Sequence, residues 1–146
     1  MKLAIITGGS RGLGKSLVNT FCVKGFDVIS ISRGERELNH INLLKHFRQD
    51  LCDLEGIEEL FKQIEELINQ KYYDEIVLIN NAGIIGDIKR VDDLTKENIS
   101  KTINTNLIAP IYISSQFLSL IKKNIKVRVL NISSGASLNP YYGWSL

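Results

Sequence analysis

A glycine-rich stretch near the start of the chain constrains the fold more than any other feature. The apolar residues 3–6 lead into Thr7–Gly14, where glycines follow the spacing Gly8-x-x-x-Gly12-x-Gly14 before a helical pattern begins. Glycines adopt positive φ and let a ligand approach the backbone closely. Such glycines also occur in ordinary turns. The strand before and the helix after favour a loop whose free N–H groups bind an anion such as a pyrophosphate.

Length and composition narrow the class of protein. A chain of 146 residues, 44% hydrophobic and 23% charged, is typical of one soluble globular domain. The net charge of +2 favours no polyanionic partner, so we expect no binding to nucleic acid. Cys22 and Cys52 are too few for a disulfide framework or a metal cluster, and we expect core thiols in a reducing compartment. The first apolar run is too short for a signal peptide or a membrane span, which predicts a cytoplasmic protein without membrane contact.

Apolar strands and amphipathic helices alternate along the chain. Strands are predicted over residues 2–7, 27–32, 45–49, 75–80 and 126–132. Helices are predicted between the glycine turn and Gly25, over residues 35–44, after an N-cap at Asp53, and over residues 96–122. This alternation predicts an α/β fold with a doubly wound parallel sheet in the order 3-2-1-4-5. A ligand is expected beyond the carboxyl ends of the first and fourth strands, where the winding reverses.

The end of the second predicted strand distinguishes between two nicotinamide dinucleotides. A site for NAD usually carries an acid there, which holds the ribose hydroxyls. Asp27 lies at the opposite end of this strand, and we interpret it as a solvated residue. Ser32 and Arg33 occupy the expected position. Arg33 together with Arg11 suits the 2′-phosphate of NADP, because a guanidinium can donate hydrogen bonds to two phosphate oxygens at once. The alternative is that both arginines are ordinary surface charges.

Four more motifs follow in chain order, at the ends of predicted strands and in the long helix. They are Asp50-Leu51, Asn80-Asn81-Ala82-Gly83, Asn104-Thr105-Asn106-Leu107 and Asn131-Ile132-Ser133-Ser134. Together with Thr7–Gly14, they resemble the ordered signature set of the short-chain dehydrogenase/reductase family over the whole chain. The resemblance implies a Rossmann-type NADP-binding domain over residues 1–146. It also implies an NADP-dependent oxidoreductase that transfers a hydride to a ketone or vicinal dicarbonyl.

The resemblance assigns roles to individual residues. Ser134 corresponds to the catalytic serine that polarises the substrate carbonyl, although Ser133 and Ser134 would pass for loop residues without the family context. Asn106 corresponds to the catalytic asparagine. The cofactor-binding residues implied are Gly8, Ser10, Arg11, Gly12, Leu13, Gly14, Ser32, Arg33, Asp50, Leu51, Asn81, Ala82 and Gly83. His40 and His46 match no family position, and we expect each on the surface or packed against a helix. No metal is expected.

A physical argument also supports a functional role for Asn106. Pro110 lies four residues later in a helical pattern and has no N–H to donate. The carbonyl of Asn106 would therefore lose its helical partner and could hold a water at a kink. The family is thought to use such a water in a proton relay. The alternative is a simple structural kink, with Asn106 an ordinary helix residue.

The end of the sequence departs from the family. Pro140-Tyr141-x-Gly143-Trp144 is similar to the branch of sepiapterin reductases and bacterial benzil reductases, in which the catalytic Tyr-x-x-x-Lys would start directly after Leu146. Tyr141 and Tyr142 have no lysine four residues later, so we interpret them as loop or pocket-wall residues. We therefore expect an N-terminal portion of a longer reductase, lacking the C-terminal strands and helices of the family fold and inactive alone.

This expectation has consequences for partners. The strand over residues 126–132 would be an unpaired sheet edge, and one face of the last two strands would lose its covering helix and expose apolar side chains. We expect a small-molecule carbonyl substrate, and either a homo-oligomer or association through the edge strand. Two alternatives remain open: a non-catalytic NADP-binding fragment, or a partner subunit of a full-length reductase.

Overall fold

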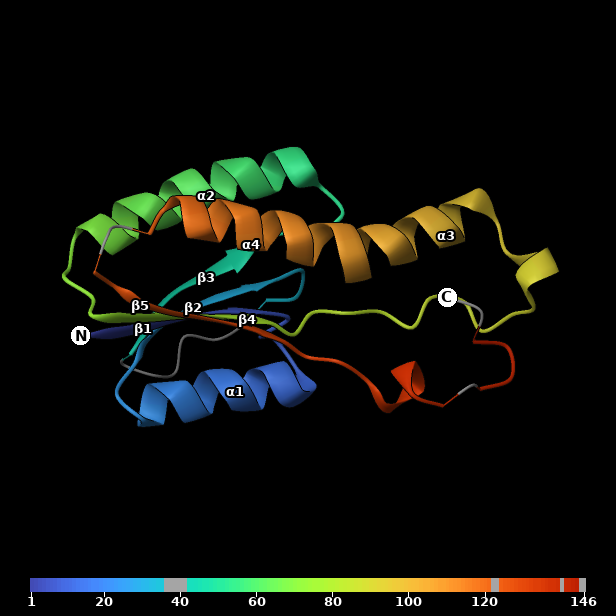
Figure 1. Ribbon diagram of the computed structural model, residues 1–146, viewed down its shortest axis with the longest axis horizontal. Coiled ribbons are helices and arrows are strands. Elements are labelled where there is room, and N and C mark those ends of the chain that lie inside the picture. Colours follow the sequence, from blue (N-terminus) through green and yellow to red (C-terminus); the bar gives the residue numbers. More distant parts are fainter. Residues whose placement is uncertain (36–41, 122–123, 140, 145–146) are drawn as a thin grey trace.

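The computed structural model describes residues 1–35, 42–121, 124–139 and 141–144, and these ranges form one parallel sheet with helices (Figure 1). The strands are β1 (Lys2–Thr7), β2 (Asp27–Ser32), β3 (Leu43–Arg48), β4 (Glu75–Asn80) and β5 (Lys126–Asn131). Neighbouring strands all pair in parallel, in the order β3-β2-β1-β4-β5. The predicted doubly wound α/β fold and its strand order are confirmed.

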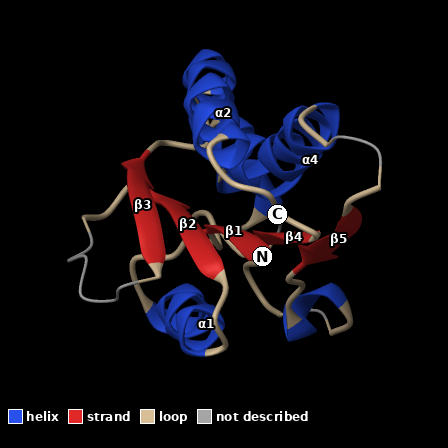
Figure 2. Ribbon diagram, turned by 90° about the vertical axis from the view of Figure 1, so that its left-hand side faces the viewer, coloured by secondary structure: helices blue, strands red, loops and turns tan. Residues whose placement is uncertain are grey.

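Helices lie on both faces of the sheet. Helix α1 (Gly12–Val23) covers one face, whereas α2 (Leu54–Asn69) and α4 (Ala109–Ser119) cover the other (Figure 2). Strands β2 and β4 are buried along their whole length. The continuous apolar run of β4 is typical of a central parallel strand that is covered on both faces. The remaining helical segments are α3 (Lys96–Ile103), the π-helical η2 (Asn104–Ile108), and the single turns η1 (Val91–Asp93) and η3 (Gly135–Ser137).

The local sequence explains where α1 and α2 begin and end. Asp53 caps α2, because its Oδ1 accepts a hydrogen bond from the backbone N–H of Gly56 at 3.0 Å, and the predicted N-cap is confirmed. Gly25, with φ of +79°, follows the end of α1, in a conformation that glycine adopts without strain. The inward residues of α2 recur at helical spacing and are all buried: Ile57, Leu60, Phe61 and Ile64.

Two predicted helices differ from the structure. The helix predicted over residues 35–44 is wrong at its end, because Leu43 and Leu44 belong to β3; residues 36–41 lie outside the described residues. Leu43 is buried and pairs with Val28, so packing in the core outweighs the local helical pattern. The single helix predicted over residues 96–122 is divided into α3, the π-helical turn η2, and α4, which ends at Ser119.

Asp27 is not the solvated residue that its position suggested. It is buried, and its Oδ2 accepts hydrogen bonds from Lys71 Nζ at 2.9 Å and from the Tyr73 hydroxyl at 2.8 Å. A buried carboxylate is tolerated here because it is paired and hydrogen-bonded. Its pairing opposite Leu3 keeps it at the far end of the sheet from the carboxyl ends of the strands, as predicted.

Strand β5 is the edge of the described sheet, as predicted, because it pairs with β4 alone. Its exposed apolar side chains include Val129 and Leu130. The predicted exposure of β4 is wrong, since Val77 and Ile79 pack in the same core cluster as α1. Of these two strands, only β5 therefore exposes large apolar side chains. In the part of the chain that the structure describes, no helix is both long and apolar enough to cross a membrane.

Candidate functional site

A cavity of about 470 Å³ lies at the carboxyl ends of the central strands. All the residues that the sequence predicts to bind a nucleotide line it, from the glycine loop, the end of β2, the loop after β3 and the loop after β4. Four further residues line it: Gly34, Gln49 and Ile84, which each adjoin a predicted binding residue, and Thr105, which adjoins the predicted catalytic Asn106. The structure therefore brings together, at one edge of the sheet, segments that are far apart in the sequence.

The glycine loop combines close packing with an open side. A Cβ at Gly14 would meet the carbonyl oxygen of Gly8, and one at Gly9 would meet Ser30 Oγ, so both positions exclude larger residues. Gly12 has φ of +53°, and a Cβ there would meet no atom within 4 Å. The backbone of Gly12 is therefore accessible at the N-terminus of α1, where the helix dipole favours an anion.

Thr7 and Asn81 lock the ends of β1 and β4 together beneath this loop. Thr7 Oγ1 accepts hydrogen bonds from the backbone N–H groups of Asn81 and Ala82, each at 3.0 Å. In return, Asn81 Nδ2 donates to the carbonyl oxygen of Thr7 at 3.0 Å. These side chains form the hydrogen bonds that backbone groups would otherwise lack where strand pairing ends. They fix the ends of β1 and β4 relative to each other below the cavity.

Arg11 and Arg33 supply positive charge at the mouth of the cavity. Both side chains are exposed, and both also line a second, adjoining cavity of about 380 Å³. Within the described ranges neither forms an ion pair, whereas other arginines do, such as Arg48 with Glu35 and Arg90 with Asp92. Both guanidinium groups therefore have donors available for a ligand, and a guanidinium binds a carboxylate or a phosphate through two parallel hydrogen bonds.

The loop after β3 contributes a buried apolar residue and an acidic residue whose side chain is hydrogen-bonded within the same turn. Leu51 is buried, and Asp50 Oδ1 accepts a hydrogen bond from the backbone N–H of Cys52 at 3.0 Å. Cys52 is only half-buried, and its Sγ lies 3.1 Å from Thr105 Oγ1, which connects this loop to η2. The carboxylate of Asp50 thus stabilises its own turn at the rim of the cavity.

Asn106 holds the loop that follows β4. Its Oδ1 accepts a hydrogen bond from the backbone N–H of Ile84 at 2.9 Å, and its Nδ2 donates to the carbonyl oxygen of Ile84 at 2.7 Å. It lies in η2, where Ala109 N–H donates to Asn104 rather than to the residue four positions back. The chain departs from α-helical geometry at the predicted place, just before Pro110. The catalytic role of Asn106 remains a prediction.

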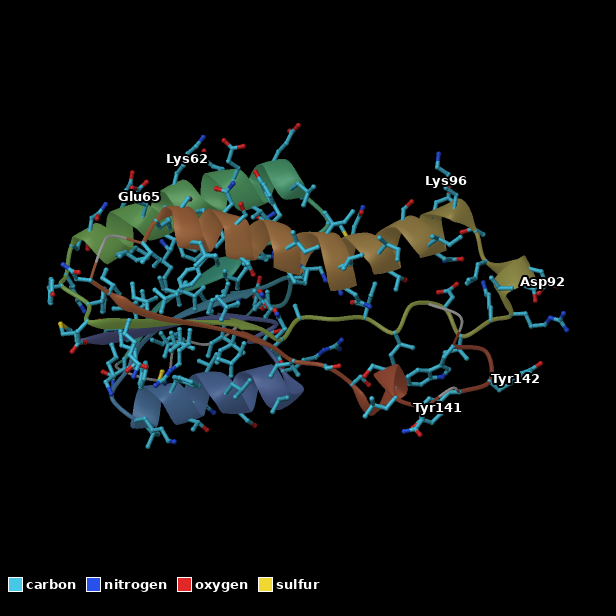
Figure 3. All side chains as sticks on the ribbon, viewed as in Figure 1. Lys62, Glu65, Asp92, Lys96, Tyr141 and Tyr142 are labelled. Carbon is cyan, nitrogen blue, oxygen red and sulfur yellow. The ribbon has the colours of Figure 1, made fainter. Side chains whose placement is uncertain are left out.

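Ser134 lies after β5 and does not line either cavity. Its Oγ accepts a hydrogen bond from the backbone N–H of Ala136 at 3.2 Å and thereby caps η3. Tyr141 and Tyr142 lie on the C-terminal segment, at the opposite end of the molecule from Lys62 and Glu65 (Figure 3). Neither predicted catalytic residue lines the cavity, although the Asn106 side chain is bonded to Ile84, which does.

His46 was expected on the surface or packed against a helix, and it is partly exposed. It is a half-buried residue of β3 whose ring is hydrogen-bonded to the end of β2 and the turn after it. The other histidine, at position 40, lies outside the described residues. Among the described residues, no group of three His, Cys, Asp or Glu side chains is arranged to hold a metal ion.

Comparisons with known sequences match almost the whole chain. The sequence model of the family described as short chain dehydrogenase matches residues 2–146. The chain is 38% identical to the benzil reductase ((S)-benzoin forming) of Bacillus subtilis, over 99% of this chain and 60% of that protein. It is 27% identical to the sepiapterin reductase of Xenopus laevis, over 99% of this chain and 61% of that protein. The chain thus spans about 60% of the length of these curated relatives.

Solved structures share the fold. A short-chain dehydrogenase/reductase from Burkholderia vietnamiensis matches with a TM-score of 0.89 at 26% identity, over 99% of this chain and 68% of that one. A 4-hydroxyisoleucine dehydrogenase complexed with NADH matches with a TM-score of 0.77 at 31% identity, over 98% of this chain and 60% of that one.

Proposed function

Because the chain belongs to the short-chain dehydrogenase family, we propose that it is the nucleotide-binding part of an NADP-dependent reductase of ketones or vicinal dicarbonyls. The observation that carries the proposal is one cavity lined by the glycine loop, Arg11, Arg33 and the loops after β3 and β4. This cavity lies at the sheet edge where the winding reverses, and open α/β sheets bind nucleotides there.

Each part of the cavity suits one part of the dinucleotide. The backbone around Gly12 offers amides and open space to the diphosphate. Arg33 and Arg11 bind the 2′-phosphate of the adenosine, assisted by Ser32 at the end of β2. The buried side chain of Leu51 packs beside the adenine, and residues 81–83 face the ribose. The remaining loop residues, Gly8, Ser10, Leu13 and Gly14, shape the backbone around the diphosphate.

Reduction of a carbonyl group also needs protein groups that contact the substrate. When bound, NADPH supplies a hydride to the carbonyl carbon. Ser134 donates its hydroxyl hydrogen to the carbonyl oxygen, where negative charge develops. The bond that Ser134 makes to the N–H of Ala136 uses an oxygen lone pair rather than this hydrogen. The backbone carbonyl of Asn106 holds a water of the proton relay, and the proton itself comes from a tyrosine outside residues 1–146.

The curated relatives support a vicinal dicarbonyl as substrate. The relative from Bacillus subtilis is named a benzil reductase, and benzil carries two adjacent carbonyl groups.

The rival to a reductase is a non-catalytic NADP-binding fragment or a partner subunit of a full-length reductase. Turnover of benzil with NADPH by the product of the gene would support the reductase. Cofactor binding without turnover would support the rival.

The preference for NADP is tested at the two arginines. In Arg33→Ala and in Arg11→Ala, we expect the dissociation constant for NADP to rise about tenfold and that for NAD to change less than about twofold, because only NADP carries the 2′-phosphate. Isothermal titration calorimetry measures both constants. Arg90→Ala is the control, since this exposed arginine pairs with Asp92 outside the cavity. A native protein that binds NAD as tightly as NADP would contradict the assignment.

We also propose that the partner is a second copy of the chain. Exposed apolar residues recur every four positions along α3, η2 and α4, and we call them the apolar stripe: Ile99, Ile103, Leu107 and Ile111. Residues four apart lie on one side of a helix. A stripe along one helical segment can contact the same stripe of a second copy across a two-fold axis, as most homodimers do.

A further inference from the structure

His46 lies on β3, beside the nucleotide cavity but outside its lining. Its ring makes polar contacts on both sides. Nδ1 lies 3.1 Å from Ser30 Oγ. Nε2 lies 2.8 Å from the carbonyl oxygen of Gly34 and 3.4 Å from Ser32 Oγ. The ring thus connects β3 to β2 and to the turn that follows β2.

The acceptors determine where the hydrogens lie. A carbonyl oxygen only accepts, so Nε2 of His46 carries the hydrogen that is donated to Gly34. In the neutral ring, Nδ1 then accepts the hydroxyl hydrogen of Ser30. The Ser32 hydroxyl donates to the same carbonyl oxygen of Gly34 at 3.1 Å. Two hydrogen bonds therefore converge on one carbonyl and hold the turn that contains Arg33.

The residues bonded to His46 are packed against the glycine loop. A Cβ at Gly34 would lie 3.0 Å from Ser10 Oγ, so the turn after β2 contacts Ser10 directly. Ser30 lies against Gly9, because a Cβ at Gly9 would meet Ser30 Oγ. His46 is therefore bonded to two residues that each contact the loop carrying Arg11. Its position couples the two segments that present the arginines.

We propose that His46 is a positioning residue that fixes Arg33 relative to Arg11 and thereby sets the preference for the 2′-phosphorylated adenosine of NADP over NAD. This inference rests on the proposed function, in which both arginines bind the 2′-phosphate. A turn held in its binding conformation loses less entropy when it captures the phosphate. The glycine loop has a further link to β2 that does not involve the ring of His46, the bond from Gly8 N–H to the Ile31 carbonyl at 2.7 Å.

The test compares three variants of His46 in the complete product of the gene. His46→Leu removes both contacts. His46→Asn has an amide that reaches only as far as Nδ1, so it keeps the contact with Ser30 and loses the bond to Gly34. His46→Gln places an N–H near the position of Nε2 and restores that bond. Lys45→Gln is the control on the same strand, because Lys45 is exposed and outside the cavity. Calorimetry gives the dissociation constants for NADP and NAD, and thermal unfolding checks the fold.

We expect His46→Leu and His46→Asn to raise the dissociation constant for NADP about tenfold and that for NAD less than about threefold. We expect His46→Gln and Lys45→Gln to retain the native preference. An unchanged preference in His46→Leu and His46→Asn, or an equal loss for both nucleotides, overturns the role of His46 and leaves the proposed function intact. A native protein that does not prefer NADP overturns the proposed function, and the role of His46 with it.

Discussion

At the scale of single residues, the buried tyrosine that is bonded to Asp27 makes the stability of the protein sensitive to alkaline pH. Tyr73 is buried and donates its hydroxyl hydrogen to Asp27 at 2.8 Å. Burial, and then this hydrogen bond to a carboxylate, raise the pKa of Tyr73 well above its ordinary value. The native state therefore keeps a proton that the unfolded chain loses near pH 10.

We expect the free energy of unfolding to fall as the pH rises above about 10, with Tyr73 contributing up to about 1.4 kcal/mol per pH unit. In Tyr73→Phe this contribution is absent, so the dependence on pH is shallower although the variant is less stable at pH 7. Urea unfolding of both proteins between about pH 9 and 11 measures the two slopes. Equal slopes would show that Tyr73 does not retain its proton in the native state.

The sequence predicted the lining of the cavity better than the partners of buried polar groups. Each predicted lining residue follows a strand end in a recognisable motif, and parallel strands bring those ends to one edge. The burial of Asp27 was missed because its partners, Lys71 and Tyr73, lie 44 and 46 residues away. His46 was missed for the same reason, since its contacts depend on how β3 pairs with β2.

At the scale of elements, the start of α2 depends on one side chain. Asp53 satisfies the N–H of Gly56, which the helix itself leaves without a partner. We expect Asp53→Ala to lower the free energy of unfolding by about 1 kcal/mol, and Asp53→Asn, which keeps an acceptor oxygen, to lower it by less than half of that. Urea midpoints at pH 7 measure both changes. Equal effects of the two substitutions would contradict the capping role.

Elements with a continuous apolar run were predictable, and the irregular helix was only partly so. Strands β1, β2 and β4 have the predicted bounds. Hydrophobic periodicity cannot distinguish one long helix from two joined by a π-helical turn, because η2 changes the spacing over only a few residues. Pro110 marked the place of the irregularity but not its kind.

At the scale of the whole molecule, the apolar stripe predicts self-association. We expect the native protein to sediment as a dimer and Ile111→Glu to sediment as a monomer, because the glutamate would be buried against apolar side chains of the second copy without an ion-pair partner. Val23→Glu is the matched control, since Val23 is an exposed apolar residue at the end of α1, on the other face of the sheet (Figure 2). A dimer that survives Ile111→Glu would point to the edge strand β5 instead.

The bonds from Thr7 to Asn81 and Ala82 join residues 74 and 75 positions apart. During synthesis, the glycine loop leaves the ribosome long before the strand that supports it. A nascent chain shorter than about 80 residues contains the whole glycine loop but lacks Asn81 and Ala82, which bond to Thr7 below that loop. If the cavity binds a nucleotide as proposed, binding therefore requires β4, and the first half of the chain folds without help from the ligand.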